Sequence, residues 1–360
     1  MASLAASYPT IFDGHNDTIL SLAQTGRSFF ERSEIGHIDL PRAREGGLGG
    51  GFFAVYIRDP SLPEAAVTDP AKAEVILRTY GDEKNWPEPM SLEYAQSAAL
   101  GYLGRLLALE RGSGGSVRIV RTAAELQQCL DDGIFAVLLH FEGAEPFDPD
   151  GHALEVFYAA GLRSVGLTHA RRNRFAQGVP FKFPHSPDTG PGLTDEGKQF
   201  VRQLNRRRVV VDLSHITEQG FWDVAAITDA PLVATHSNAH ALTPSPRNLT
   251  DRQLDAIRQS RGVAGLNFHV GFLRADGGRD RDTPVGRIVE HIDYMVERMG
   301  IDCVAFGSDF DGAIMPAGIG DAAGLPRLME ALAARGYSDA DLRKLAHGNW
   351  LRVLRETWGA

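Results

Sequence analysis

Histidine and carboxylate side chains in this 360-residue chain stand at spacings that suit the binding of divalent metal ions. His15 and Asp17 are separated by one residue and follow a short apolar run. Residues i and i+2 of an extended strand project to the same side, so both side chains can reach one ion. Glu142, His215 and His236 each stand at the end of a further apolar run. These five side chains offer the mixed nitrogen and oxygen ligands that zinc and similar ions accept.

The number of candidate ligands favours two ions rather than one. A catalytic zinc ion keeps one position open for water or substrate, so five protein ligands are too many for a single ion. A carboxylate such as Glu142 can bridge two ions, and its burial in a barrel mouth is costly without a cation. The alternatives are a salt bridge from Glu142 to a loop arginine, and ordinary core roles for His215 and His236. His140 precedes Glu142 by two residues, and we interpret it as a supporting or core histidine.

A further acidic residue, Asp309, follows the last apolar run within the segment 307–312. A carboxylate close to a water bound by two metal ions can accept the proton of that water and later donate it to a leaving amine. The alternative is an ordinary turn residue, which is our interpretation of Asp311 before Gly312. Its position at the strand end makes Asp309 the candidate proton carrier.

Eight short apolar runs carry these side chains, and each run ends abruptly in polar residues. Chemically active residues at the carboxyl ends of buried strands are typical of a (β/α)8 barrel. The chain has a suitable length for one such barrel with insertions, so we predict a single domain over residues 1–360. The runs cover residues 10–12, 51–56, 135–139, 164–168, 209–214, 232–235, 262–268 and 303–308.

Helical stretches alternate with the runs, as parallel strands with helical crossovers require. We expect long irregular loops over residues 59–89 and 175–192, and the second should cover the active face because it follows the fourth strand. Apolar spacing and cap residues predict helices over residues 94–110, 195–206, 251–260, 284–299 and 338–358.

Composition excludes several classes of protein. The formal net charge of −9 argues against a general nucleic-acid binder. The two cysteines, Cys129 and Cys303, are too few for a disulfide scaffold or a cysteine-based zinc site. There is neither a signal-peptide pattern nor an apolar stretch of about 18 residues, so we expect a cytoplasmic protein without a membrane partner. A homo-oligomer is compatible with the sequence.

These motifs resemble the membrane (renal) dipeptidase family of zinc peptidases, within the amidohydrolase superfamily. The resemblance extends from about Ile11 to Asn349 and follows the family order of motifs. It implies a (β/α)8 barrel that hydrolyses dipeptides. The motifs are the segments 13–17, 37–42, 142–143, 167–169, 211–215, 236–239, 246–250 and 307–312.

The resemblance also implies how the metal ligands are shared. His15 and Asp17 would bind one zinc ion, His215 and His236 the other, and Glu142 would bridge the two. A separate observation agrees with a bridging glutamate. Many related amidohydrolases bridge their metals with a carboxylated lysine, whereas this chain has five lysines and none ends a predicted strand.

Two further residues receive roles from the resemblance. His169 would stabilise the oxyanion, and Arg247 would bind the terminal carboxylate of the substrate, for which a planar guanidinium is well shaped. From the residues alone, Arg247 would be a surface arginine near a helix. The arginines of segment 170–174 either add a second anionic contact or are solvated loop charges. His269 is a weaker candidate for substrate contact, and segment 37–42 is interpreted as packing or barrel-bottom structure.

We therefore predict a cytoplasmic dipeptidase in which a hydroxide that bridges two Zn²⁺ ions attacks the peptide bond. The similarity to bacterial members makes L-Xaa-D-Xaa dipeptides candidate substrates. One alternative is an amidohydrolase for another amide, such as an N-acyl amino acid or a lactam, which would tolerate loss of Arg247. Another is a non-catalytic metal-binding barrel, and Asp309 and His169 argue against it because neither is needed as a structural ligand.

Overall fold

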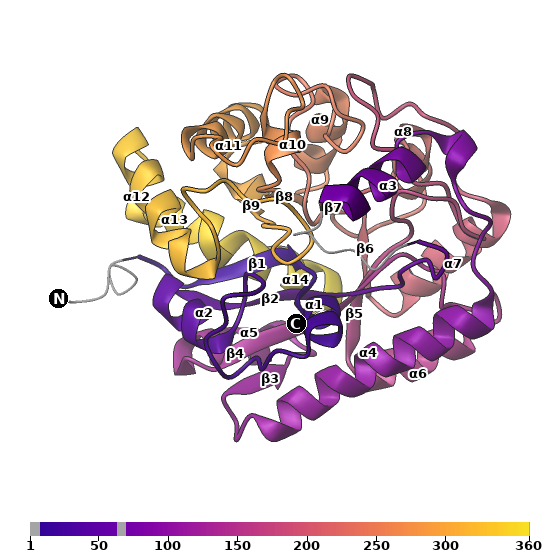
Figure 1. Ribbon diagram of the computed structural model, residues 1–360, viewed down its shortest axis with the longest axis horizontal. Coiled ribbons are helices and arrows are strands. Elements are labelled where there is room, and N and C mark those ends of the chain that lie inside the picture. Colours follow the sequence, from indigo (N-terminus) through magenta and orange to yellow (C-terminus); the bar gives the residue numbers. More distant parts are fainter. Residues whose placement is uncertain (1–7, 63–69, 360) are drawn as a thin grey trace.

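The strands of the chain form one parallel barrel in a computed structural model that describes residues 8–62 and 70–359 (Figure 1). The order around the barrel is β1-β2-β4-β5-β6-β7-β8-β9, and β3 pairs with β4 outside this ring. The strands are β1 (Ile11–Asn16), β2 (Leu48–Tyr56), β3 (Val117–Ile119), β4 (Phe135–Glu142), β5 (Leu162–Gly166), β6 (Val210–Asp212), β7 (Val233–Ala234), β8 (Val263–Leu266) and β9 (Val304–Phe306).

The barrel closes where the ends of β9 and β1 meet. The backbone N–H of Asp309 donates to the carbonyl of His15 at 3.0 Å, and the N–H of Asp17 donates to the carbonyl of Phe310 at 2.8 Å. A parallel bridge between Asn16 and Phe310 completes the join. This closure sets two of the chemically interesting segments side by side, although they are almost 300 residues apart in the chain.

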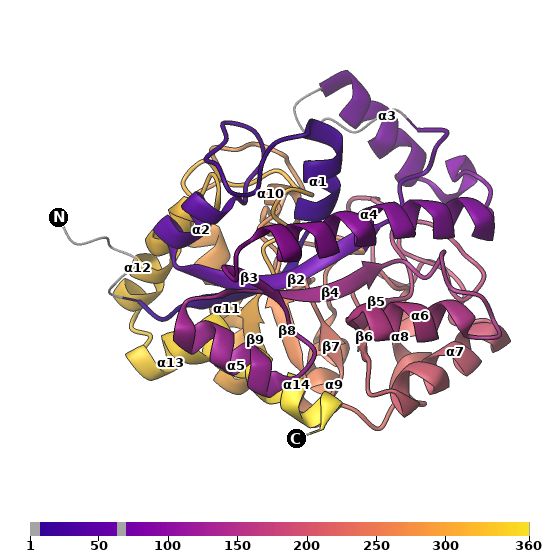
Figure 2. The same cartoon turned by 90° about the horizontal axis from the view of Figure 1, so that it is seen from below.

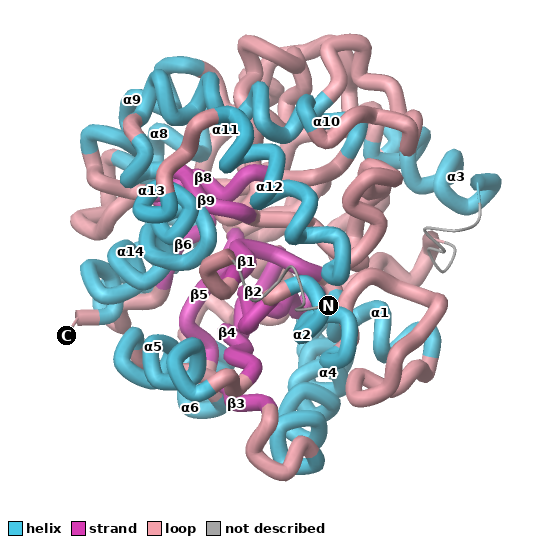
Figure 3. Tube along the Cα trace, turned by 90° about the vertical axis from the view of Figure 1, so that its left-hand side faces the viewer, coloured by secondary structure: helices cyan, strands magenta, loops and turns pink. Residues whose placement is uncertain are grey.

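Helices surround the strands, which lie at the centre of the molecule (Figure 3). The helices of the N-terminal half are α1 (Thr18–Thr25), α2 (Leu40–Gly46), α3 (Pro70–Tyr80), α4 (Leu92–Gly112), α5 (Ala123–Asp132) and α6 (His152–Ala160). Those that follow are α7 (Asp195–Arg206), α8 (Glu218–Ala225), α9 (Asp251–Gln259), α10 (Val270–Leu273), α11 (Gly286–Met299), α12 (Leu325–Arg335), α13 (Asp339–Arg343) and α14 (Asn349–Trp358).

Alternate side chains of the strands enter two separate apolar cores. In β2, Phe52 packs inside the barrel, whereas Phe53 packs in the larger cluster beneath the helices. Trp350 of α14 closes the inner core and donates its indole N–H to the carbonyl of Phe306 at 3.0 Å. Glycine is required at position 14, since a Cβ there would lie 2.4 Å from the Trp350 ring. Burial on both faces explains why the strands are continuously apolar.

The sequence predicted the barrel correctly, and the eight apolar runs correspond to its eight strands. The expected helix over residues 195–206 coincides with α7, whereas the one over 338–358 is divided by a short π-helical segment. The expectation of an irregular loop over residues 59–89 was wrong for α3, and residues 63–69 of that stretch lie outside the described part. The additional strand β3 was not predicted.

The two ends of the barrel carry different elements. Figure 2 shows α1 and α3 on the opposite side of the molecule from α5 and α14. Since the strands are parallel, all their carboxyl ends open toward the first of these sides. Among the described residues, no helix has the length and apolar character needed to cross a bilayer.

Candidate active site

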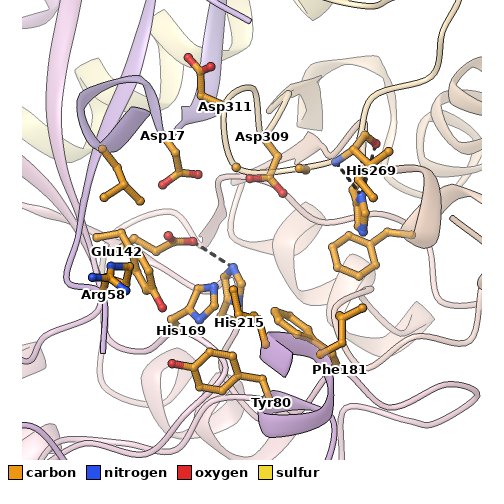
Figure 4. A pocket seen from close by; sticks show the side chains of 18 of the residues that line it. Asp17, Arg58, Tyr80, Glu142, His169, Phe181, His215, His269, Asp309 and Asp311 are labelled. Atoms are coloured by element: carbon orange, nitrogen blue, oxygen red, sulfur yellow. Dashed lines mark hydrogen bonds and ion pairs between the residues drawn. The ribbon is translucent and has the colours of Figure 1, made fainter. Parts of the chain in front are cut away.

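The five predicted metal ligands lie in one buried cluster around Glu142. The Oε1 atom of Glu142 is 3.0 Å from Nε2 of His215 and 3.5 Å from Nε2 of both His15 and His236. Asp17 joins through Oδ2, which is 3.6 Å from Nε2 of His15. Asp17 follows β1 as the first residue before α1, so it stands just beyond the strand on which it was expected. Figure 4 shows Asp17 and Glu142 facing one cavity.

Two residues of the site have strained backbones. His215 and Asp309 have φ angles of 70° and 63°, in the left-handed region that favours glycine. Such conformations cost of order 1 kcal/mol and concentrate at functional sites. Both residues stand just beyond strand ends, at β6 and β9, and the turn directs their side chains into the cavity.

Neighbouring hydrogen bonds fix the tautomer of His236. Thr235 donates its hydroxyl proton to Oδ2 of Asp212 at 2.7 Å, so its oxygen must accept the Nδ1–H of His236, also at 2.7 Å. The lone pair of His236 is therefore on Nε2, which faces Nε2 of His215 at 3.0 Å. Orientation of a histidine by a hydroxyl and a carboxylate behind it is common in metal sites.

The cluster is electrostatically incomplete without a cation. Burial, followed by the charges of Arg247 and His15, lowers the pKa values of His215 and His236 well below their usual range. His236 directs its lone pair at Nε2 of His215, which also lies 3.0 Å from the Glu142 carboxylate, and neither neutral imidazole supplies a positive charge that would balance this carboxylate. Burial raises the pKa of Glu142 to about 8, which is a second sign of an uncompensated negative charge.

The raised pKa of His15 also indicates that the site lacks a cation. Burial lowers its pKa, but the carboxylates of Glu142 and Asp17 outweigh burial and raise the pKa to about 10. Its two ring nitrogens have no hydrogen-bond partner in the described chain. The carboxylates that hold a proton on this ring would equally hold a metal cation there. The donor set thus fits a divalent metal.

The candidate ligands form three neighbouring groups, and within each group the ligand atoms lie within 4.8 Å of one another. Since each group could hold an ion, the site can accommodate more than one ion. One group joins His15, Asp17 and Asp309, and another joins Glu142, His169 and His215. A third joins Glu142 with His15 and His236. Glu142 belongs to two of these three groups and His15 to two, so the groups overlap at these two residues.

Asp309 and Asp311 occupy different environments. Oδ2 of Asp309 accepts from the side-chain amide of Asn267 at 2.8 Å, and burial raises the pKa of Asp309. The carboxylate of Asp311 is instead saturated by Arg27 at 3.0 Å and by the backbone N–H of His37 at 2.6 Å. The segment 37–42 thus begins beside the active-site loop, which contradicts the barrel-bottom interpretation and leaves the packing interpretation.

A cavity of about 240 Å³ opens above the cluster (Figure 4). Its floor includes Asp17, Glu142, His215 and Asp309. Its walls are mostly apolar or aromatic, with two arginines, and comprise Leu20, Tyr56, Leu62, Ile76, Leu77, Tyr80, Phe181, Phe272, Arg58 and Arg279. An apolar chamber with a few convergent polar groups is the usual form of a small-molecule site.

His169 stands in this cavity within an aromatic enclosure. Its ring centroid is 4.6 Å from that of Tyr56, 5.8 Å from that of Tyr80 and 4.5 Å from that of His215. Burial, aided by the positive charge of Arg171, lowers the pKa of His169 well below its usual range. The neutral ring retains one N–H that can donate to a substrate oxygen.

Arg171 braces this enclosure rather than facing the substrate. Its side chain donates to Oε1 of Glu145 at 2.7 Å and to the carbonyl of Ile57 at 2.6 Å. It also donates to the hydroxyl of Tyr56 at 3.0 Å and contacts that of Tyr80 at 3.4 Å. Both sequence interpretations of this residue, as a second anionic contact and as a solvated charge, were wrong. The sequence around Arg171 could not reveal this role, because its hydrogen-bond partners belong to distant segments of the chain.

Arg247 is buried beside the site, so its interpretation as a surface residue from composition alone was wrong. One guanidinium nitrogen donates to the carbonyl of His236 at 3.2 Å, while Nε and Nη1 have no partner in the described chain. Burial lowers its pKa to about 10, against the opposing effect of Asp309, so the side chain is charged at neutral pH. The guanidinium also lies 5.4 Å from the ring of Phe272, which lines the cavity.

The other two histidines near the site have contrasting positions. His140 is fully buried behind the ligands, with Nδ1 at 3.0 Å from the Ser164 hydroxyl, as a supporting histidine should be. His269 lines the cavity and packs on Phe272 with a centroid distance of 4.6 Å.

Comparison with known proteins gives a consistent match over nearly the whole chain. Residues 2–359 match the family model described as membrane dipeptidase, peptidase family M19. The structure of a metallopeptidase from Rhodobacter sphaeroides, liganded with a phosphinate mimic of the dipeptide L-Ala-D-Ala, has 46% sequence identity and a TM-score of 0.91. It covers 98% of this chain and 100% of its own.

Two further relatives extend the comparison. A family M19 metallopeptidase named dipeptidase AC has 46% identity and a TM-score of 0.89, covering 98% of this chain and 99% of its own. An uncharacterized protein of Klebsiella pneumoniae, from the pqqA 5′ region, is 54% identical over 246 residues, which are 68% of this chain and 91% of the relative.

Proposed function

Since the chain belongs to the membrane dipeptidase family and is a peptide hydrolase, we propose that it is a two-zinc dipeptidase for L-Xaa-D-Xaa substrates. The observation that carries the proposal is the cluster in which Glu142 lies within 3.5 Å of three imidazole nitrogens. These groups fit a metal cation, and the proton carrier Asp309 stands beside them in the same cavity.

His15 and Asp17 would hold one ion and His215 and His236 the other, with Glu142 between them. The mixed imidazole and carboxylate donors suit zinc. When bound, such ions lower the pKa of water and polarise a substrate carbonyl. The support for two positions is that Glu142 belongs to two of the ligand groups, one with His15 and His236 and one with His169 and His215.

Asp309 moves the proton in this proposal. Asn267 donates to Oδ2, which leaves Oδ1 to receive the proton of the attacking water. Burial makes protonation of the carboxylate easier than in water, so the same group can pass the proton to the leaving nitrogen. Donation turns that nitrogen into an amine, which departs readily.

His169 and Arg247 would orient the dipeptide. The His169 ring, fixed among Tyr56 and Tyr80, donates an N–H to the carbonyl oxygen as negative charge develops there. Nε and Nη1 of Arg247, which lack partners in the described chain, would bind the free carboxylate of the substrate. Recognition of that carboxylate explains a preference for dipeptides over longer chains, whose next residue would replace it.

The proposed preference for L-Xaa-D-Xaa dipeptides comes from a relative whose structure contains a bound dipeptide mimic. That Rhodobacter sphaeroides protein bears a mimic of L-Ala-D-Ala, and it shares 46% of its residues with this chain. The small cavity, with largely apolar walls, is compatible with short side chains of this kind.

Hydrolysis of a matched set of compounds by the zinc-loaded protein tests the proposal. The set is L-Ala-D-Ala, L-Ala-L-Ala, N-acetyl-L-Ala and L-Ala-D-Ala amide, with metal content measured on the same sample. We expect the fastest turnover with L-Ala-D-Ala and slow turnover of the amide, which lacks the carboxylate. Two bound metals without hydrolysis of either dipeptide would refute the function, and faster hydrolysis of N-acetyl-L-Ala would favour the amidohydrolase alternative.

A further inference from the structure

A second cavity, of about 740 Å³, lies at the opposite end of the barrel. Its lining comes from α5, the first residues of β5, the segment before β6 and the end of α14. The beginnings of parallel strands lie at the other end from the catalytic side chains. Figure 3 shows the C-terminal end of α14 near α5 and α6, where this cavity is located.

Positive charge predominates in this cavity, although the whole chain has a net charge of −9. Two aspartates, Asp131 and Asp132, belong to the lining as well. They leave an excess of basic groups, since the arginines that line the cavity are Arg121, Arg163, Arg207, Arg208 and Arg355.

Backbone carbonyls hold the central arginine in place. The guanidinium of Arg163 donates to the carbonyls of Arg121, Tyr158 and Leu162 at 2.9, 3.2 and 2.7 Å. It also lies 4.1 Å from the centroid of the Tyr158 ring. Neutral carbonyl oxygens orient a guanidinium without cancelling its charge, and Nη2, which donates to none of these three carbonyls, is left to meet an anion.

The other arginines follow the same pattern. Arg208 contacts the carbonyl of Trp358 at 3.5 Å, and Arg355 donates to the side-chain oxygen of Gln127 at 3.2 Å. Within residues 8–62 and 70–359, Arg207 alone of the five forms an ion pair, with Glu155. Four of the five guanidinium groups are therefore held by neutral oxygens, and the cavity keeps a net positive charge after Glu155, Asp131 and Asp132 are counted.

The N-terminus of α5 adds a second, independent positive feature. Thr122, Ala123 and Ala124 line the cavity, so the first turn of this 10-residue helix is directed at it. A helix N-terminus carries about half a positive charge and favours phosphate groups. Trp358, whose indole N–H donates to the carbonyl of Arg163 at 3.3 Å, supplies a flat apolar surface beside the charges.

We propose that this cavity binds a small organic anion with two phosphate groups. The volume exceeds what a single inorganic phosphate needs, and the arginines are distributed over α5, β5, α14 and the segment before β6 rather than gathered at one point. Two separated phosphates can thus each meet a guanidinium, with the intervening part of the ligand against Tyr158 and Trp358. The site is independent of the peptidase reaction.

Calorimetric titration of the metal-loaded protein at low salt tests the proposal with two probes and their uncharged counterparts. Fructose 1,6-bisphosphate is compared with fructose, and adenosine 3′,5′-bisphosphate with adenosine. We expect saturable binding of at least one phosphate compound with a Kd below about 1 mM. The stronger of the two probes tells whether the ligand is a sugar phosphate or a nucleotide. Absence of saturable binding of both phosphate compounds would overturn the proposal.

Arg208→Gln should weaken binding about tenfold, the effect of losing one charged contact. Arg261→Gln is the matched control: both residues follow a helix and have similar φ angles of 54° and 60°, but Arg261 pairs with Glu356. The control should leave the Kd unchanged. Dipeptide turnover should stay constant in both variants.

Arg163→Gln provides a second variant at the centre of the cavity and should weaken binding by at least as much as Arg208→Gln. Circular dichroism and unchanged dipeptide turnover establish that it folds. Unaltered affinity in both cavity variants, or an equal loss in Arg261→Gln, would overturn the proposal, because the bound anion would then lie elsewhere.

Discussion

The two ends of the barrel balance their charges in opposite ways. At the active-site end, charged groups are buried and face one another directly, as Arg171 faces Glu145 and His15 faces Glu142. At the other end, arginines such as Arg163 are only partly buried and are held by backbone carbonyls. Buried charge must be compensated permanently, whereas partly exposed charge can exchange water for a ligand. The first end therefore suits a resident metal, and the second suits a reversible anion.

Asp309→Asn should have the largest effect. Loss of the proposed proton carrier should reduce kcat by about 10³-fold, because general acid–base catalysis contributes about 10²–10⁴-fold. Metal content should stay unchanged, since Asn keeps the shape of the side chain. Steady-state kinetics and metal analysis on one preparation measure both quantities.

Asp131→Asn is the control at the opposite end, where a carboxylate lines a cavity without chemistry, and it should leave kcat unchanged. If Asp309→Asn retained kcat within a few-fold of the wild type, proton transfer would have to be assigned to another group.

Arg171→Met should have the next largest effect, on stability. Removing one partner of a buried ion pair leaves Glu145 uncompensated, and the free energy of unfolding should fall by about 3–5 kcal/mol. Arg163→Met, whose partners are neutral carbonyls, should lose only about 1–2 kcal/mol. Chemical denaturation measures both.

A second substitution distinguishes lost charge balance from lost packing. Arg171→Met combined with Glu145→Gln should recover part of the loss, because no buried charge remains unpaired. Equal losses for Arg171→Met and Arg163→Met would contradict the contrast between the two ends.

Arg247→Gln should have the smallest of the three effects. Loss of a charged hydrogen bond to the substrate carboxylate should lower kcat/KM for dipeptides by about 10²-fold. For a dipeptide amide, which lacks that carboxylate, kcat/KM should fall only slightly. Arg355→Gln at the other end of the barrel should change kcat/KM for neither substrate. An equal loss on dipeptide and amide would show that Arg247 acts on the fold of the site rather than on the carboxylate.

Local sequence patterns predicted the strands and the candidate ligands but not every helix. The helix α7 was predicted with its bounds, because Thr194 caps it and its apolar face is regular. The helix α6 has Gly151 directly before it, and its first N–H groups donate instead to Asp148 further upstream, so no cap residue adjoins its start. The helix α3 was expected as a loop, although Ala73, Ile76, Leu77 and Tyr80 repeat at helical spacing in the sequence.

The sequence by itself determined which residues stand at the strand ends, because a buried strand and the polar residues that end it are adjacent in the chain. Which of those residues share a cavity depended on closure of the barrel, which joins His15 to Asp309. Likewise, only the tertiary structure decided that Arg171 pairs with Glu145 while Nε and Nη1 of Arg247 find no partner among the described residues. The state of a charge is set by neighbours from distant segments, and no local pattern contains that information.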